Sequence, residues 1–580
     1  MVKKHGLCSS YYGFLIMAMA LISLPIAYSQ ESSSHLRFVS NATEFPSEDY
    51  YDYIIVGGGT AGCPLAATLS EKYRVLVLER GSVPDGVPSL MTQEGFLTAI
   101  TEVDDYDSPT QAFTSEDGVR NARGRVLGGS SAINAGFYSR ADQEFYGRSG
   151  INWDSGLVHQ SYEWVEKAIV FTPILNSWQL AVRDGLLETG VHPYHGFKLD
   201  HVVGTKVGGT TFDHNGTRFS AVDLLSYANP DNIRIVLHAN VERVIVKSSL
   251  TYSGSKQVAT GVVFRDRLGQ YHQAMVREKG EVLLSAGALG SPQLLLLSGI
   301  GPTPYLSSMG IPVTLHLPYV GQFMYDNPRN GISIMPPNPL DHSLIQVVGI
   351  TKSGTYLEAT SNVIPFASSA LPDSVRVPYS PFYLTVATLM EKFIGPLSTG
   401  SLRLESTDVK ANPIVRFNYF SNPADLQRCM NGTRKIAEVL RSSSMENFRF
   451  RELFGGQNFR YIGPALPADL ADDYQMGDFC RRTLSTIWHY HGGCLVGKVV
   501  DPHLRKKIDV AYLFIISVIL SRLRSILPEN RRQVSKANHG DKVRKDEPNS
   551  CTHQSPECRK LITHCINCFQ ERKLLFNEQL

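Results

Sequence analysis

The stretch Tyr53-Ile-Ile-Val-Gly-Gly-Gly-Thr-Ala-Gly62 decides the fold of this chain. Its first four residues are apolar and largely β-branched, which predicts a buried strand. Gly57, Gly59 and Gly62 then form a Gly-x-Gly-x-x-Gly pattern, and Cys63–Leu69 predicts a helix. The first glycine permits a tight turn, the second lets the backbone approach a pyrophosphate, and the third lets the helix pack on the strand. The stretch therefore predicts a dinucleotide-binding βα unit.

A second strand and an acidic residue complete this pattern. Val75–Leu78 predicts another buried strand, and Glu79 follows it, about 20 residues after Gly59. An acidic residue at this place accepts hydrogen bonds from ribose hydroxyls, and the preceding helix N-terminus favours phosphate through its amides and dipole. A glycine motif alone is weak support, but strand, glycines, helix, strand and acid together predict a nucleotide cofactor.

The overall composition is globular and nearly neutral. The chain has 580 residues, of which 43% are hydrophobic and 19% charged, and 56 Lys and Arg against 54 Asp and Glu leave a net charge of +2. This composition excludes a mostly disordered protein. The balanced charge gives no reason to expect a nucleic-acid partner.

The N-terminus carries the pattern of a secretory signal peptide. Lys3-Lys-His5 is a basic start, Phe14–Ala27 is apolar, and Ala27-Tyr-Ser29 is a small-x-small cleavage pattern. The alternative is a membrane anchor, but about 14 apolar residues fall short of the roughly 20 that a span needs. We expect residues 1–29 to be removed and the protein to enter the secretory pathway, extracellular or vacuolar, with no stable membrane span.

Other features agree with that route. Three Asn-x-Thr sequons predict glycosylation at Asn41, Asn215 and Asn431. In an oxidising compartment Cys429 and Cys480 are a plausible disulfide pair.

Two further stretches, Gly124–Gly136 and Gly287–Gly301, are rich in glycine and small residues. Such loops let backbone amides approach a flat ligand closely. The second stretch follows an apolar run, Glu281–Ser285, which predicts a strand. Each stretch taken alone is also explained by a tight turn from strand to helix.

On these stretches the chain resembles the glucose-methanol-choline (GMC) oxidoreductase family of FAD proteins. The stretch from Gly124 resembles the first signature of the family and the one from Gly287 the second, and the resemblance covers about residues 48–505. Within the family the chain is most similar to the plant mandelonitrile lyase branch, through Asn215–Leu225, Tyr325–Gly331 and Trp488–Cys494.

The resemblance implies an α/β fold, in which a Rossmann-like FAD-binding domain is interleaved with a substrate domain built on an antiparallel sheet. The implied division is a signal peptide at 1–29, the FAD-binding domain at 48–145 and 200–320, the substrate domain at 146–199 and 321–480, a partial FAD and active-site segment at 481–505, and an atypical, largely disordered tail at 506–580.

The resemblance also implies a set of FAD-binding residues. These residues are expected to contact the pyrophosphate, the ribose, the isoalloxazine or the adenine of FAD. In chain order they are Gly57, Gly59, Thr60, Ala61, Gly62, Glu79, Arg80, Val126, Gly128, Gly129, Ser130, Asn134, Val241, Trp488 and His489.

His489 heads His-x-x-Gly-Gly and matches the catalytic histidine of the family. Histidine suits a general base because its ordinary pKa lies near neutrality. In a lyase it takes the hydroxyl proton of a cyanohydrin while cyanide departs, and a positive field helps the leaving anion. In an oxidase it takes the alcohol proton while hydride leaves for the flavin. His491 is expected to be a packed, hydrogen-bonded residue.

Three functions follow, of which the first is favoured. The first is a secreted FAD protein that cleaves (R)-mandelonitrile to benzaldehyde and hydrogen cyanide. The second is an FAD-dependent alcohol oxidase or dehydrogenase, and the third is an inactive variant. We expect a small-molecule cyanohydrin or alcohol substrate, a monomer, and no metal site.

The tail after Arg505 departs from the family. The strand, the Asn-Pro or His-Pro element and the final helix of the family are not recognisable there. Val510–Leu520 is too short to span a membrane and is expected to form a strand or a helix on the core. The cysteines and histidines between Cys551 and Cys568 match no zinc finger spacing. We favour an altered end over an appended module, and we expect weak FAD binding or poor turnover.

Overall fold

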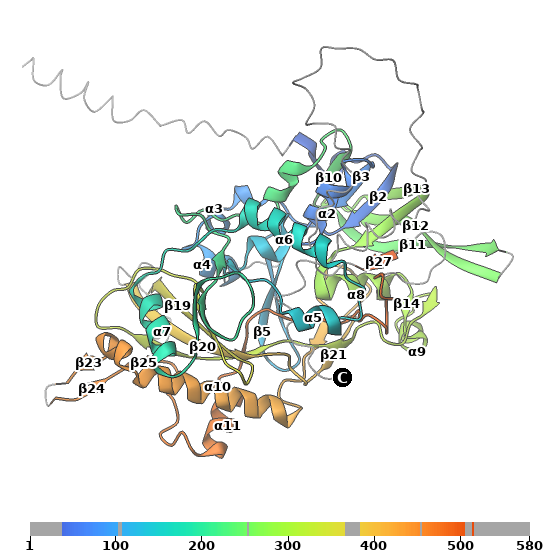
Figure 1. Ribbon diagram of the computed structural model, residues 1–580. Helices are drawn as coiled ribbons and strands as arrows, with labels where there is room; N and C mark the ends of the chain where they lie inside the picture. Colours follow the sequence, from blue (N-terminus) through green and yellow to red (C-terminus); the bar gives the residue numbers. More distant parts are fainter. Residues whose placement is uncertain are drawn as a thin grey trace, which may run out of the picture. The chain divides into compact units, whose positions relative to one another are not determined.

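The computed structural model describes residues 37–101, 107–251, 254–365, 383–452, 455–504 and 513–515. Two large sheets organise this part of the chain, and the backbone passes between them more than once (Figure 1). The expected signal peptide, the Cys551–Cys568 cluster and nearly all of the expected tail lie outside the described residues.

The first sheet contains the predicted dinucleotide-binding unit. Its strand order is β1-β10-β3-β2-β13-β12-β11, and β27 pairs with the end of β13. The neighbours from β1 to β13 are parallel, whereas β13, β12 and β11 form an antiparallel meander. The strands of this sheet are β1 Val39–Asn41, β2 Glu48–Val56, β3 Val75–Leu78, β10 Ile233–Leu237, β11 Asn240–Thr251, β12 Gly254–Arg265, β13 Tyr271–Leu284 and β27 Leu513–Ile515.

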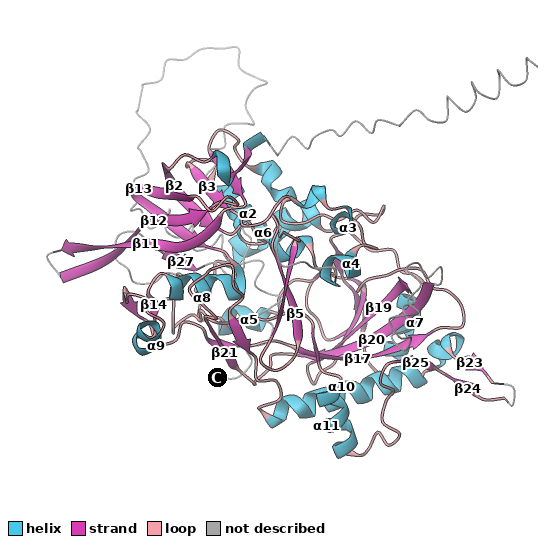
Figure 2. Cartoon of the chain, turned by 180° about the vertical axis from the view of Figure 1, so that it is seen from behind, coloured by secondary structure: helices cyan, strands magenta, loops and turns pink. Residues whose placement is uncertain are grey.

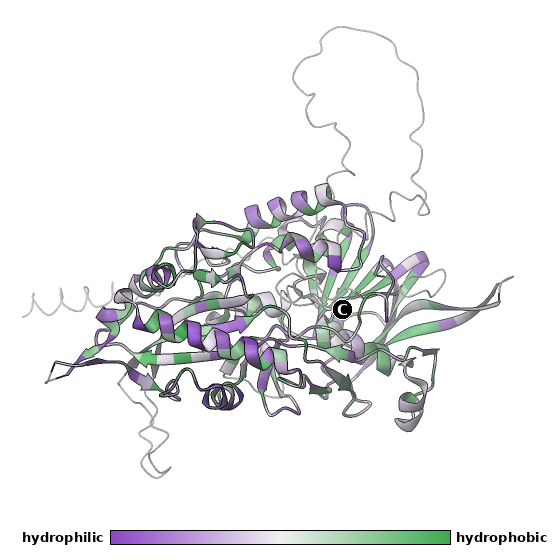
Figure 3. Ribbon diagram, turned by 60° about the horizontal axis from the view of Figure 1, so that its bottom comes forward, coloured by the Kyte–Doolittle hydropathy of each residue, from purple (hydrophilic) through white to green (hydrophobic). Residues whose placement is uncertain are grey.

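Apolar side chains on both faces explain why these strands are central. All four residues of β3 and the last four of β2 are buried, as is usual for parallel strands covered on both sides. Helix α2 (Gly62–Leu69) packs on β2 and β3, and of its residues only Thr68 is not buried. Figure 3 shows these strands as largely hydrophobic.

Strand β27 falls inside the run Val510–Leu520 of the atypical tail. Leu513, Phe514 and Ile515 pair in parallel with Val282, Leu283 and Leu284 of β13. The run was expected to be a strand or a helix on the core, and the strand is the form found. The first sheet therefore gains a short strand from the segment that follows Arg505.

The second sheet is antiparallel apart from its edge pair β7 and β8. Its order is β25-β17-β20-β19-β18-β8-β7, and β26 also pairs with β17. Its strands are β7 Tyr194–Phe197, β8 Gly204–Val207, β17 Pro328–Met335, β18 Val347–Ile350, β19 Thr355–Pro365, β20 Tyr383–Phe393, β25 Arg460–Ile462 and β26 Ser485–Thr486.

Helices cover one face of the second sheet. Helix α10 (Pro423–Arg441) packs against β17, β19 and β20, α7 (Ser177–Glu188) packs against β18 and β19, and α11 (Asp473–Arg482) packs on α10 (Figure 2). Cys429 on α10 and Cys480 on α11 form a disulfide, so the predicted pairing is confirmed. Since one face is covered by helices, the other is left to line a cavity.

Shorter elements connect the two sheets. The remaining helices are α3 Pro88–Met91, α4 Phe96–Thr101, α5 Gln143–Arg148, α6 Ser155–Ile169, α8 Gly287–Leu297 and α9 Thr303–Ser308, with 3-10 turns η2 Ala42–Glu44, η3 Pro84–Gly86, η4 Gly129–Ala132, η5 Asp223–Tyr227 and η7 Ser443–Phe448. The small sheets pair β4 Thr110–Thr114 with β5 Arg120–Gly124, β6 Phe137–Tyr138 with β9 Gly209–Thr210, β14 Ile300–Gly301 with β15 Leu315–His316, β23 Phe450–Arg451 with β24 Gln457–Asn458, and β21 Gly400–Arg403 with both β16 Gln322–Met324 and β22 Ile414–Arg416.

The fold class predicted from the sequence is confirmed: a parallel nucleotide-binding sheet and an antiparallel second sheet alternate along one chain. Among the described residues, no helix combines the length and the apolar character needed to cross a bilayer.

Candidate active site

A cavity of about 830 Å³ lies where the glycine-rich loops of the first sheet face the open side of the second sheet. The predicted site residues that line it are Gly57, Gly59, Thr60, Ala61, Glu79, Arg80, Gly129, Ser130, Asn134, Val241, Trp488 and His489. Gly62, Val126 and Gly128 lie behind this lining. The tertiary structure therefore brings together segments that are more than 400 residues apart in sequence.

The glycine cradle has the close approaches that the motif requires. A Cβ on Gly62 would overlap the carbonyl oxygen of Gly57, so only glycine lets α2 start this close to the end of β2. Ser285, which follows β13, holds the turn from the other side, because its Oγ donates to the Gly57 carbonyl at 2.7 Å. The first glycine-rich stretch and the residue that follows β13 thus form one cradle.

Glu79 is buried and accepts two backbone hydrogen bonds. The amides of Gly58 and Gly81 each donate to one carboxylate oxygen at 2.9 Å. Burial raises the pKa of Glu79, and these hydrogen bonds and neighbouring Arg80 oppose the shift. Each oxygen keeps acceptor capacity toward the cavity, which is what binding of a ribose hydroxyl needs. Arg80 donates to Gln111 at 2.6 Å, and burial lowers its pKa to about 10.

The loop from Gly128 to Asn134 rests directly on the cradle. The Gly128 amide donates to the Gly58 carbonyl at 2.7 Å, and Val126 behind it is fully buried. The Asn134 side-chain oxygen accepts from the Gly136 amide at 2.9 Å and from Arg218 at 3.1 Å. The side chain that orients this loop therefore comes from the Asn215–Leu225 run, which sequence reasoning noted without assigning it a role.

The His489 segment is fixed by the run Tyr325–Gly331. The Thr486 hydroxyl donates to Asp326 at 2.7 Å and accepts from the Trp488 amide at 2.7 Å. Trp488 has φ +58°, an uncommon backbone for a bulky residue, and its indole faces the cavity beside His489. Two of the runs that carried the family resemblance thus build one corner of the site.

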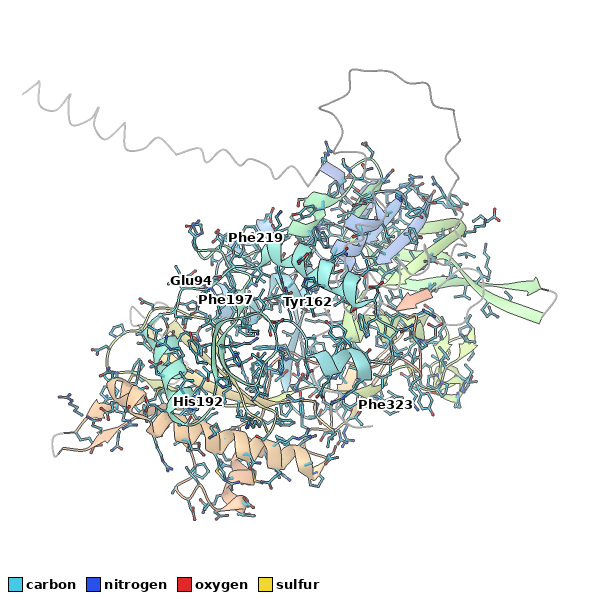
Figure 4. The ribbon with its side chains drawn as sticks, viewed as in Figure 1. Glu94, Tyr162, His192, Phe197, Phe219 and Phe323 are labelled. Carbon is cyan, nitrogen blue, oxygen red and sulfur yellow. A yellow bond between two sulfur atoms is a disulfide. The ribbon has the colours of Figure 1, made fainter. Side chains whose placement is uncertain are left out.

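His491 is packed rather than exposed to the cavity, in agreement with the sequence interpretation. Its backbone exchanges two hydrogen bonds with Tyr325, its ring stacks on the Tyr325 ring at 5.2 Å, and its Nδ1 lies 3.0 Å from the His489 carbonyl. A Cβ on Gly492 would overlap the carbonyl oxygen of Phe323, which is labelled in Figure 4. The glycines after His489 therefore let this segment pack closely against its neighbour.

The opposite wall is the open face of the second sheet. Strand side chains alternate between faces, so residues two apart share the cavity side. Register places Lys392 of β20 between Arg329 of β17 and Tyr356 of β19, and Met390 between Gly331 and Glu358. The cavity-facing residues of these strands are Arg329, Gly331, Ser333, Tyr356, Glu358, Thr360, Asn362, Thr388, Met390 and Lys392.

Charged side chains on this wall are the main feature that sequence reasoning missed. Lys392 Nζ donates to Glu358 Oε1 at 2.7 Å and lies 4.4 Å from the Tyr356 ring. The Arg329 guanidinium stacks 5.4 Å over the Trp488 indole. Burial lowers the pKa of Arg329, and Glu358 opposes the shift. Two cations and one carboxylate therefore face the cavity that His489 also lines. The sequence contained one signal for Arg329. Side chains alternate between the two faces of the strand that begins at Pro328, and this places Arg329 on the face opposite Ile332 and Ile334.

The remaining predicted positions lie away from the cavity. Asn215 and Asn431 are exposed, and Asn41 is half-buried at the start of η2. Glycosylation at the three sequons stays a prediction.

Comparison with known sequences identifies the family. The GMC oxidoreductase family matches residues 51–328 with its N-terminal domain and residues 396–518 with its C-terminal domain. The chain belongs to the GMC oxidoreductase family. The C-terminal match reaches past Arg505 and includes β27.

Several curated relatives are similar over most of the chain. An (R)-mandelonitrile lyase-like protein of Arabidopsis thaliana is 64% identical, covering 81% of this chain and 85% of its own length. (R)-mandelonitrile lyase 2 of Prunus dulcis is 47% identical, and the alignment covers 85% of this chain and 88% of the relative. Sinalpyl alcohol oxidase Nec3 of Nesocodon mauritianus is 46% identical, covering 85% and 89%. The resemblance to the mandelonitrile lyase branch is confirmed.

A solved structure shares the fold. Formate oxidase of Aspergillus oryzae RIB40, in which FAD modification was studied, has a TM-score of 0.66 at 20% identity, over 82% of this chain and 95% of its own. FAD is the cofactor of this chain, as its family implies, and the residues present fit it. The glycine cradle leaves room for a diphosphate, Glu79 offers acceptors for a ribose, and the cavity continues past Asn134 to Trp488 and His489.

Proposed function

We propose that this protein is a hydroxynitrile lyase that cleaves (R)-mandelonitrile to benzaldehyde and hydrogen cyanide. The observation that carries the proposal is that His489, Arg329 and Lys392 line the same cavity as the glycine cradle. A base for the hydroxyl proton and cations for the leaving anion are the two groups that this reaction needs. The identity to mandelonitrile lyases over most of the chain supports it.

The proposed reaction uses these residues in order. The His489 imidazole accepts the hydroxyl proton of the cyanohydrin, the C–CN bond breaks, and its electron pair leaves with cyanide while the oxygen becomes the aldehyde carbonyl. Arg329 and Lys392 stabilise the cyanide anion electrostatically. The protonated imidazole then returns its proton to cyanide, which leaves as hydrogen cyanide. Atoms and charge balance without a net oxidation.

FAD, when bound, would supply an electron-poor ring system and, in a redox reaction, an acceptor for hydride. We propose that the motif residues given above hold it, with Gly57 to Gly62 at the diphosphate, Glu79 at the ribose, Val241 at the adenine and Asn134 near the isoalloxazine.

The visible spectrum of the purified chain, before and after addition of mandelonitrile, tests the proposal. Flavin bands that survive dialysis and stay unbleached while benzaldehyde appears are the expected result. Bands that bleach without release of cyanide would overturn the lyase and support the second candidate, an alcohol oxidase. That candidate is favoured by the identity of 46% to Sinalpyl alcohol oxidase Nec3. A chain without flavin bands would overturn both.

Secretion, the domain division and the effect of the tail belong to the same proposal. We propose removal of residues 1–29 and passage through the secretory pathway, and mass spectrometry of the secreted chain tests both. We also propose the domain division predicted from the sequence, with boundaries near residues 145, 200, 320 and 480. Weak flavin retention is the expected effect of the atypical tail, so the flavin-to-protein ratio after dialysis measures it.

A further inference from the structure

One carboxylate oxygen in the cavity wall lacks a hydrogen-bond donor. The side chain of Glu358 is 2% exposed, and its Oε1 accepts from Lys392 Nζ at 2.7 Å. Its Oε2 is buried and has no partner among the described residues. The side-chain oxygen of Asn362 lies four residues further along β19, and Asn362 also lines the cavity. This oxygen is buried without a hydrogen-bond partner in the part of the chain that the structure describes. A buried acceptor that lacks a hydrogen bond costs free energy, so this wall is suited to a hydrogen-bond donor from a ligand.

The surroundings of Glu358 limit what that donor is. An anionic group is repelled by the Glu358 carboxylate, and a cationic group is repelled by Lys392, which already pairs with it. A neutral hydroxyl satisfies the carboxylate oxygen and adds no charge. Hydrogen bonds from a hydroxyl to a carboxylate are also stronger than those between neutral groups.

The rest of the wall beside Glu358 offers apolar contacts for an aromatic ring. In the row that contains Glu358, register places Met390 beside it, and the Met390 side chain packs against Gly331 of the next strand. Phe137, Ile345 and Met390 form a buried apolar cluster that borders the same cavity. Ser333 and Thr388 hydrogen-bond to each other at 2.9 Å, so they satisfy one another in the next row.

We propose that Glu358 is a specificity-determining residue that accepts a hydrogen bond from a hydroxyl on the aromatic ring of the substrate. The substrate class is then a hydroxylated aromatic cyanohydrin or its aldehyde, rather than one with a bare ring. This inference rests on the proposed function for the reacting group, and it adds the identity of the ring substituent.

Binding of four aldehydes to the flavin-loaded protein tests it: benzaldehyde, 3-hydroxybenzaldehyde, 4-hydroxybenzaldehyde and 4-methoxybenzaldehyde, each titrated by calorimetry. A hydroxybenzaldehyde is expected to bind about 10- to 100-fold more tightly than benzaldehyde, because one charge-assisted hydrogen bond is gained. The methoxy compound fills the same space without a donor, so it is expected to show no gain. Equal binding of all four by the unaltered protein would overturn the proposal, and no variant is needed for that result.

Two variants locate the effect. Glu358→Gln is expected to lose most of the preference for the hydroxyl over the methoxy group, since the amide also offers a donor. Glu391→Gln is the matched control, because Glu391 is a buried glutamate on the neighbouring strand whose carboxyl abuts Gly432 of α10 on the other face of the sheet. An unchanged preference in Glu358→Gln, or equal losses in both variants, would overturn the assignment.

Turnover separates this inference from the proposed function. A holoprotein that prefers hydroxybenzaldehydes but neither cleaves nor oxidises a cyanohydrin supports the Glu358 inference and overturns the proposed function. A holoprotein that cleaves mandelonitrile yet binds the four aldehydes equally supports the proposed function and overturns the Glu358 inference. Absence of binding by every aldehyde overturns the inference.

Discussion

The two walls of the cavity are built in different ways. The wall from the first sheet is made mainly of backbone and small side chains, with Gly57, Gly59 and Gly129 at its surface. The wall from the second sheet is made of side chains on neighbouring strands, among them Arg329, Glu358 and Lys392. A backbone wall suits a cofactor whose shape is shared by a whole family, whereas a side-chain wall can change one residue at a time. Under the proposed function, cofactor and substrate selection are therefore separated in space.

The largest expected effect comes from breaking the backbone wall. In Gly62→Val the new side chain collides with the Gly57 carbonyl, so we expect loss of nearly all bound flavin. The flavin-to-protein absorbance ratio after dialysis measures it. Gly86→Ala is the control, because a Cβ there meets nothing within 4 Å. Normal flavin content in Gly62→Val would show that the cradle is not the cofactor site.

Removal of the base is expected to separate chemistry from binding. His489→Asn should lower the rate of mandelonitrile cleavage by about 10²- to 10⁴-fold, because proton transfer loses its acceptor. The flavin spectrum should be retained. His214→Gln, at an exposed position, serves as the control. A rate within a few-fold of the unaltered protein would remove His489 from the mechanism.

The disulfide tests how far the second sheet depends on its covering helices. Cys429 and Cys480 are 51 residues apart in sequence, and closing a loop of that length stabilises by about 4 kcal/mol in the chain-entropy account. The double change to alanine should lower the melting temperature and leave flavin binding in place. Cys494→Ala, which changes a free cysteine, should have a much smaller effect.

The cations of the side-chain wall are expected to matter for rate more than for cofactor binding. Arg329→Gln should slow cleavage on the order of 10²-fold, because one stabilising group for the leaving anion is lost. Steady-state kinetics with mandelonitrile, together with the flavin ratio, measure both properties. Loss of flavin without a change in the rate per bound flavin would contradict the separation of the two walls.

The smallest expected effect concerns Glu391, behind the side-chain wall. Burial holds its pKa well above the ordinary value of 4.5, and its carboxyl has no hydrogen-bond partner among the described residues. The folded state therefore binds this proton more tightly than the unfolded state. That contribution to stability is fully present below about pH 4.5 and is lost as the pH rises through the folded-state pKa.

Glu391→Gln should remove that pH dependence. Its melting temperature is expected to fall less than that of the unaltered protein as the pH is raised above 4.5, by several degrees at most. Melting curves at a series of pH values measure the difference. Parallel curves for the two proteins would show that Glu391 does not titrate as its burial requires.

Sequence patterns predicted the backbone wall better than the side-chain wall. Strands β2 and β3 and helix α2 lie where the motif placed them, because glycine spacing and apolar runs act on neighbouring residues. Arg329 was visible in the run Tyr325–Gly331, but no local rule connects it with Trp488, which is more than 150 residues later. The run that contains β27 was predicted to form either a strand or a helix, since an apolar run of that length is compatible with both.

The sequence by itself determined the nucleotide-binding unit, the family and the cofactor, since each depends on local spacing or on a motif shared with relatives. Only the tertiary structure decided which polar side chains face the cavity. That outcome depends on strand register, because a slip of one residue would turn Arg329, Glu358 and Lys392 toward the helices. Register is set by contacts between β17, β19 and β20, whose residues are distant along the chain.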